Sequence, residues 1–183
     1  MMATERNGFG SRIVGWRVVG WGAAVGVLSV PLIAMQFTEE VNWTASDFAF
    51  AGALFGTVGL LIEWAVWRSS SSAYRVGVAA AALAGLLIIW ANGAVGMIGS
   101  EDNSYNIWFG APVLVALGGS IMARFRARGM ARAMMAAAAI HASVAFGGMT
   151  VDPRGVVFSL LLSSFWLIAA TCFQGSDSRR TTV

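Results

Sequence analysis

The sequence predicts an all-α integral membrane protein, a bundle of about six transmembrane helices with both termini in the cytoplasm of a bacterium. Hydrophobic residues make up 57% of the 183 residues and charged residues only 11%, against about 25% charged residues in an ordinary soluble domain. The apolar residues form long blocks, each near the ~20 residues that a helix needs to cross a ~30 Å hydrocarbon layer. A soluble domain of this length has too little interior to bury several such blocks.

Six apolar blocks can be assigned within one transmembrane domain that covers residues 1–183. They are residues 18–37, 48–67, 76–98, 107–123, 130–149 and 156–173. The fifth block is the least apolar because alanine dominates it, and if it stayed on the surface the C-terminus would change sides. The first block is long enough to span, and no cleavage site followed by a soluble domain comes after it, so we expect it to remain as the first helix. The loops are short, which predicts that sequential helices pack as antiparallel neighbours.

The arginines predict the orientation. The chain has twelve arginines and no lysine, and eleven of them precede the first block, lie in the loops after the second and fourth blocks, or follow the sixth (Arg6, Arg12, Arg17, Arg68, Arg75, Arg124, Arg126, Arg128, Arg132, Arg179 and Arg180). Only Arg154 falls in an alternate loop. Because arginine-rich short loops stay in the cytoplasm, six crossings with the N- and C-termini inside satisfy every loop at once. The predicted location is the bacterial inner membrane.

Composition also excludes several classes of partner and cofactor. The net charge is +3, but the arginines sit at the ends of apolar blocks without interleaved aromatic residues, which argues against nucleic-acid binding. Cys172 is the only cysteine, which rules out an internal disulfide and disfavours a cysteine metal cluster. The sequence indicates no particular cofactor. The expected partners are the lipid bilayer and either another membrane protein or further copies of this chain.

Small residues predict close helix contacts, since glycine lets helix backbones approach within a membrane. They recur on one face of the first, second and third predicted helices (Gly22 and Gly26; Gly52, Gly56 and Gly59; Gly85, Asn92, Gly96 and Gly99). We interpret them as packing surfaces of a bundle. The alternative is that Gly93, Gly96 and Gly99 mark an unwound half-helix beside a substrate path.

Three polar residues fall at membrane depth, where an ionisable group suggests function by default. We interpret Glu63 as half of an interfacial ion pair with Arg68 or a nearby loop arginine; the alternative is a cation or proton site. We expect His141, the only histidine, to be neutral and bonded to a hydroxyl across the bundle; a proton relay or a metal ligand is the alternative. Asn92 is either a structural hydrogen-bond donor between helices or part of a polar vestibule.

The predicted outer loops hold the densest polar cluster (Glu39, Glu40, Asn42, Asp47, Glu101, Asp102, Asn103 and Asp152). Glu101, Asp102 and Asn103 are weak candidates for a Ca²⁺ site, because this ion prefers carboxylate and amide oxygens. Their spacing is not that of an EF-hand, and we favour a solvated acidic surface. Asp47 and Asn106 are expected to start the second and fourth helices as capping residues.

Two segments resemble an uncharacterised family of small polytopic inner-membrane proteins of proteobacteria. They are residues 34–43 (AMQFTEEVNW) and 92–103 (NGAVGMIGSEDN), and the segments 123–126 and 128–133 also fit. The resemblance covers most of the chain and implies a membrane location and a bacterial source. It implies no activity and transfers no functional residue.

Three classes of function remain open. The favoured one is a non-catalytic accessory or assembly component that acts through helix packing, since buried charge is scarce and the helices are rich in glycine. The second is a small oligomeric channel or transporter that uses Asn92, His141 or the acidic loops. An intramembrane enzyme comes last, because no serine is marked by its neighbours as an activated nucleophile and no catalytic residue can be named.

Overall fold

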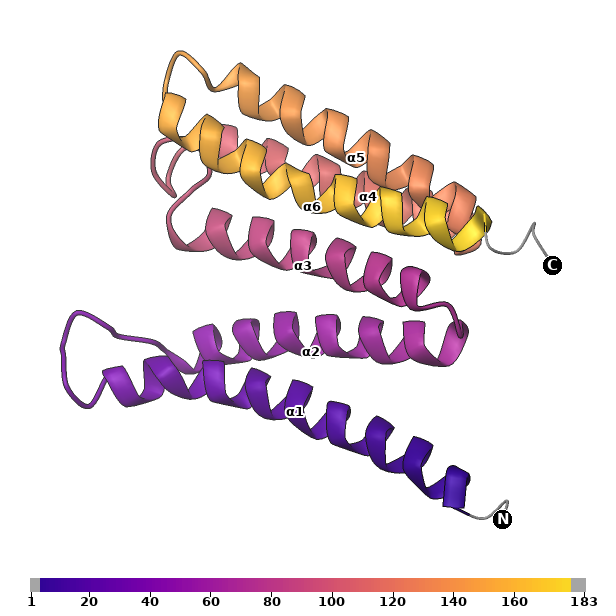
Figure 1. Ribbon diagram of the computed structural model, residues 1–183. Helices are drawn as coiled ribbons and strands as arrows, with labels where there is room; N and C mark the ends of the chain where they lie inside the picture. Colours follow the sequence, from indigo (N-terminus) through magenta and orange to yellow (C-terminus); the bar gives the residue numbers. More distant parts are fainter. Residues whose placement is uncertain (1–3, 179–183) are drawn as a thin grey trace. The chain divides into compact units, whose positions relative to one another are not determined.

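In the part of the chain that the structure describes, the regular secondary structure is all helical, which confirms the predicted all-α class. A computed structural model describes the backbone of residues 4–178 and the side-chain surroundings of residues 15–177. The helices are α1 (Thr4–Ala34), α2 (Ala45–Arg68), α3 (Ser72–Ala94), α4 (Gly110–Met122), α5 (Ala127–Gly147) and α6 (Pro153–Ser178), with a 3₁₀ helix η1 (Ser104–Phe109) before α4 (Figure 1). Six helical segments, with η1 and α4 forming one of them, are long and apolar enough to cross a membrane.

The chain forms two compact units, residues 1–59 and residues 60–183, and the division falls inside α2. In the first unit, Thr44 and Asp47 form a capping box at the start of α2: the Asp47 carboxylate accepts hydrogen bonds from the Thr44 N–H (2.7 Å) and hydroxyl (2.8 Å). Asp47 therefore helps to start this helix, as predicted. Farther along, the Trp21 indole lies against Gly59, where a Cβ atom would come within 2.7 Å of it.

In the second unit, α6 lies between α3 and α5, and α4 packs on α5 (Figure 1). The prediction that sequential helices are neighbours holds for α4, α5 and α6. It is wrong for α3, whose main partner is α6 rather than α4. The physical reason is the connection at residues 95–109, which is long enough to carry the chain across the end of the bundle before α4 begins.

Alanine builds the centre of this bundle. The most buried positions of α5 and α6 include Ala137, Ala145 and Ala169, each 0% exposed. On α4, a Cβ atom at Gly119 would lie only 2.6 Å from the Cβ of Ala133 on α5. Small side chains bring these helices together, so the alanine content that makes α5 the least apolar block also lets α5 pack closely between α4 and α6.

The structure also corrects the end of α3, which lies at Ala94 although the apolar block continues to residue 98. Beyond it, Gly96 and Gly99 have φ values of +77° and +74°, a left-handed conformation that stops a helix and favours glycine. Gly96 and Gly99 therefore do not share a helix face with Gly85, which corrects that part of the prediction. At the chain ends, Arg179, Arg180 and the side chains of Arg6 and Arg12 lie outside the described residues.

Gly77 on α3 offers a direct test of this packing, because the Phe173 ring of α6 lies where its Cβ would be, at 2.9 Å. Phe173 is fully buried and meets the Tyr74 ring edge-on, so it has little room to move. We expect Gly77→Ala to destabilise the protein by about 1–3 kcal/mol, measured by reversible unfolding in detergent micelles. Gly85→Ala in the same helix is the control: its Cβ meets nothing within 4 Å, and it should be neutral or slightly stabilising. Equal effects of the two changes would contradict the packing.

Candidate functional site

Asn106 organises one end of the second unit. This residue of η1 is 5% exposed, and its side-chain oxygen accepts hydrogen bonds from the backbone N–H groups of Met97 (3.2 Å) and Ile98 (2.9 Å). Its side-chain nitrogen donates to the Ser100 carbonyl at 2.8 Å. One amide side chain thus satisfies three backbone groups of the segment that follows α3, where no helix or strand can satisfy them.

Asp152 and Asn103 complete this arrangement. The Asp152 carboxylate accepts from the Gly99 N–H (3.0 Å) and, at the start of α6, from the Gly155 N–H (2.9 Å). Asn103 donates to the Ile98 carbonyl (3.0 Å) and accepts from the Tyr105 N–H. We call the group formed by Asn92, Asn103, Asn106 and Asp152 the asparagine end. It ties α3, η1 and the α5–α6 loop together.

The segment held by these residues closes the end of the bundle with apolar side chains. Met97 and Ile98 are 1% and 0% exposed, and the Ile98 side chain lies where a Cβ of Gly148 would be. Tyr105, beside them, donates its hydroxyl proton to the Val144 carbonyl of α5 at 2.7 Å. Residues 95–99 are indeed unwound, as the half-helix alternative requires, but in this structure they form an apolar plug.

Asn92 and Asn106 have roles that sequence analysis predicted only in part. The Asn92 side chain donates to the Asn106 carbonyl at 2.8 Å, so it joins the end of α3 to η1, in keeping with the structural interpretation. Asn106 does not start a helix: Asn103 is the N-cap of η1, and α4 has no side-chain cap. The expected cap at Asn106 is therefore wrong by three residues, because the chain forms a 3₁₀ turn before α4.

The three candidate calcium ligands, Glu101, Asp102 and Asn103, lie in different surroundings. Glu101 and Asp102 are exposed, whereas both side-chain atoms of Asn103 are engaged in the loop. Among the residues that the structure describes, no three His, Cys, Asp or Glu side chains come close enough to hold a metal ion together.

His141 lies between α5, α6 and η1 and is 0% exposed. The Trp166 indole N–H donates to its Nδ1 atom at 3.3 Å, and the Phe109 ring meets the imidazole edge-on. An indole nitrogen can only donate, so Nδ1 accepts and the proton of neutral His141 is on Nε2. The partner is thus an indole and not the expected hydroxyl.

Three buried side-chain atoms of the described residues have no hydrogen-bond partner. They are the His141 Nε2 atom, the Ser159 hydroxyl oxygen and the side-chain oxygen of Asn92. His141 is six residues before the end of α5 and Ser159 is six residues after the start of α6, so the two lie at about the same depth. Glu63, the remaining residue predicted at membrane depth, is partly buried on α2.

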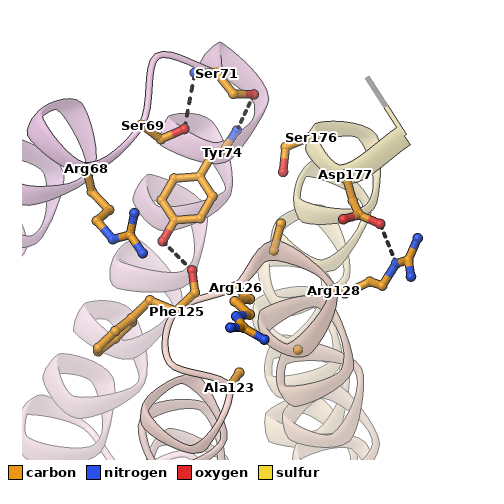
Figure 2. A pocket seen from close by; sticks show the side chains of 12 residues that line it. Arg68, Ser69, Ser71, Tyr74, Ala123, Phe125, Arg126, Arg128, Ser176 and Asp177 are labelled. Carbon is orange, nitrogen blue, oxygen red and sulfur yellow. Dashed lines mark hydrogen bonds and ion pairs between the residues drawn. The ribbon is translucent and has the colours of Figure 1, made fainter. Parts of the chain in front are cut away.

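The opposite end of the second unit contains a polar pocket of about 520 Å³. Its walls come from the α2–α3 loop, the α4–α5 turn and the last turn of α6 (Figure 2). The residues that line it, which we call the arginine pocket, are Arg68, Ser69, Ser71, Tyr74, Ala123, Phe125, Arg126, Ala127, Arg128, Gly129, Ser176 and Asp177. The arginines that predicted topology therefore also build a concave site.

The α4–α5 turn reaches this pocket in a strained conformation. Arg124 and Phe125 have φ values of +50° and +56°, which costs about 1–2 kcal/mol for a residue with a side chain. Their N–H groups bond back to Ile121 and Ser120, a Schellman ending of α4 with arginine where glycine is usual. The turn is held from outside as well, since the Phe125 carbonyl accepts from the Tyr74 hydroxyl at 3.1 Å and its ring meets that of Trp64.

Two arginines at this end are engaged with groups of the chain. Arg75 donates to the carbonyls of Ser69 (2.7 Å) and Val66 (3.1 Å) and so caps the end of α2. Arg128 pairs with Asp177 on α6 (Figure 2). Within the described residues, the structure gives Arg68 and Arg126 no such partner. Sequence analysis missed Tyr74, Phe125 and Asp177, because only the packing of α3 and α6 against the α4–α5 turn brings them to the arginines.

The fold and these two ends define a multi-pass membrane protein built as a helical bundle. Comparison with protein-family models, with curated proteins and with solved structures finds no match to this chain.

Removal of the Asn106 amide tests the asparagine end. We expect Asn106→Ala to cost about 1–3 kcal/mol of stability, because buried backbone groups at residues 97, 98 and 100 lose their partners. Amide hydrogen exchange should accelerate at residues 97–100 and remain unchanged in the arginine pocket. Ser104→Ala changes an exposed neighbour and serves as the control. Unchanged protection at residues 97–100 would show that Asn106 does not hold the loop.

Low pH should loosen the same loop through Asp152. Hydrogen bonds from the Gly155 and Gly99 N–H groups, aided by Arg154, hold the pKa of Asp152 below its ordinary value. A lowered pKa contributes stability that is fully present above the ordinary value of about 4 and is lost as the pH falls through the lowered value. The difference in melting temperature between wild type and Asp152→Asn should therefore shrink as the pH is lowered below about 4. A difference independent of pH would contradict this role.

Proposed function

We propose that this protein is a non-catalytic accessory or assembly component of the bacterial inner membrane that acts through helix packing. One observation carries the proposal. The polar residues that would serve transport or catalysis at the asparagine end, Asn92, Asn106 and Asp152, are used to hold the chain itself. A transporter keeps such groups for its substrate, whereas a packing component uses them to fix its own shape.

The apolar plug supports the same conclusion. Met97 and Ile98 are buried at the asparagine end of the second unit, where a path into the bundle from that end would have to begin. The two buried atoms farther in, on His141 and Ser159, lie behind them. The lack of hydrogen-bond partners for these two buried atoms favours the second candidate, a small channel or transporter. His141 and Ser159 are therefore the residues to change in testing it.

The first unit supplies faces suited to another helix. Gly22 and Gly26 on α1, and Gly52 and Gly56 on α2, form two glycine pairs with the spacing that lets transmembrane helices approach closely. Within that unit no atom lies within 4 Å of a Cβ built at any of the four. A helix of a partner protein, or of a second copy of the chain, would find space for backbone contact there.

The orientation belongs to the same proposal. In the second unit the described arginines, apart from Arg154, lie at or near the end that contains the arginine pocket. The positive-inside tendency then places this end in the cytoplasm and the asparagine end outside. A tag inserted beside Asp102 would accordingly be reachable in intact spheroplasts, and a tag found in the cytosol would reverse the assignment.

The deciding experiment is purification of the full chain from its native membrane into nanodiscs, followed by native mass spectrometry. We expect a complex in which a partner protein, or further copies of the chain, is present in fixed ratio. Replacing Gly52 and Gly56 by leucine should dissociate it, because the bulky side chains prevent close approach. Gly118→Leu, also at a helix position open to space, should leave the complex intact.

The transport alternative has a distinct signature in the same preparation. A chain that remains a monomer without partner, and that conducts ions or small solutes in liposomes, would contradict the packing function. Loss of that flux in His141→Ala or Ser159→Ala would establish the path. Absence of flux together with a fixed-ratio complex would support the accessory function.

A further inference from the structure

We propose that the arginine pocket binds a phosphate group, presented in the membrane by the headgroup of an anionic phospholipid. The pocket measures about 520 Å³, within the range of pockets that hold small ligands. Three guanidinium groups line it against a single carboxylate, that of Asp177. The excess of positive charge favours binding of an anion in the pocket.

Two of the guanidinium groups are available to meet that anion. Arg128 is paired with Asp177, whereas the described residues provide no partner for Arg68 and Arg126. These two come from different parts of the chain, the end of α2 and the α4–α5 turn, and both line the pocket (Figure 2). A planar guanidinium offers paired N–H donors that match two oxygens of one phosphate, so it recognises this group by shape as well as by charge.

The backbone adds donors of the same kind. The helix α5 begins at Ala127, and its N-cap, Arg126, makes no side-chain capping bond. Its first-turn residues, Ala127, Arg128 and Gly129, line the pocket. Helix N–H groups without a partner and the positive end of the helix dipole favour phosphate at such a position.

Hydroxyl groups of the α2–α3 loop contribute as well. The Ser69 and Ser71 oxygens accept hydrogen bonds from the N–H groups of Ser71 (3.2 Å) and Tyr74 (3.4 Å). Since each oxygen acts as an acceptor in these bonds, its own proton is left to be donated. The pocket therefore presents donors of three types, and its one acidic group is already neutralised by Arg128.

The strained turn fixes these groups before a ligand arrives. Arg124 and Phe125 hold left-handed conformations next to Arg126, and the contacts of Phe125 with Tyr74 and Trp64 keep them there. Strain kept in this way is typical of sites that are organised in advance for a ligand. Without such a role, glycine at position 124 would end α4 at lower cost.

The position of the pocket identifies the source of the phosphate. Its walls are the ends of helices that are long enough to span a bilayer, so it lies at the level of the lipid headgroups. Trp67, in the last turn of α2, is 82% exposed, as expected for a ring that settles at this level. Basic pockets between transmembrane helices at the membrane surface bind anionic headgroups.

The test compares lipid binding by the full-length protein and two matched variants. Protein in detergent is titrated with phosphatidylglycerol, with cardiolipin or with zwitterionic phosphatidylcholine, and bound lipid is counted by native mass spectrometry. We expect saturable binding of the anionic lipids alone, weakened about tenfold by Arg126→Gln and further by the double change with Arg68→Gln. The control is Arg132→Gln, which removes an exposed arginine of α5 that does not line the pocket and should bind as wild type does.

A second arm separates the two sources of phosphate. Inorganic phosphate is titrated against the same proteins, with the melting temperature as the readout. Saturable stabilisation by phosphate at lower concentration than by lipid would assign the pocket to a soluble phosphate ligand instead of a headgroup. No saturable binding by wild type in either arm would overturn the proposal, and so would an equal loss of binding in Arg132→Gln. The wild-type result decides this even if a pocket variant fails to fold.

Discussion

The need to satisfy every backbone polar group without water governs this structure. Inside a bilayer an unpaired N–H or C=O costs several kcal/mol, so a chain crosses it as a helix, in which the groups pair internally. Within a helix the backbone groups already have partners, but the N–H and C=O groups at helix ends need partners from elsewhere. The two ends of the second unit are therefore where the chain uses its scarce polar side chains.

The two ends meet this constraint with different chemistry. At the asparagine end, a neutral amide on Asn106 and the carboxylate of Asp152 accept from consecutive N–H groups at residues 97–99. At the arginine end, Arg75 donates to carbonyls at the end of α2, and a left-handed turn closes α4. The first end pairs the backbone N–H groups of residues 97–99 with its own side chains and is closed by the apolar side chains of Met97 and Ile98. The second leaves N–H groups and guanidinium groups facing a pocket.

This asymmetry connects the proposed function with the proposed lipid site. A bundle closed at one end by its own side chains has little to offer a transported solute, but it has a rigid shape that a partner can recognise. A headgroup bound at the other end would join α2, α3, α5 and α6 at the membrane surface. Binding of a structural lipid at one end is thus compatible with packing against a partner protein.

Sequence alone was sufficient for the helical class, for the presence of six apolar segments and for the gathering of arginines in alternate loops. These are properties of local composition, because solvation by lipid acts on each segment separately. Local pattern also marked Asp47 as a residue that starts a helix, since a capping box involves only four neighbouring residues.

Tertiary structure decided which polar residues meet. Asn106 serves a segment eight to nine residues away, the indole of Trp166 reaches His141 from the next helix, and Tyr74 holds a turn fifty-one residues distant. The packing of α3 against α6, instead of α4, brings Asp177 and the α2–α3 loop to the arginines of the α4–α5 turn. Periodicity in the sequence shows that a helix has a face of apolar or small residues. Several helices of this chain have such a face, so periodicity does not identify which two pack together. The choice between them depends on the complementary shapes of particular side chains, such as Phe173 over Gly77, and those exist only in the folded chain.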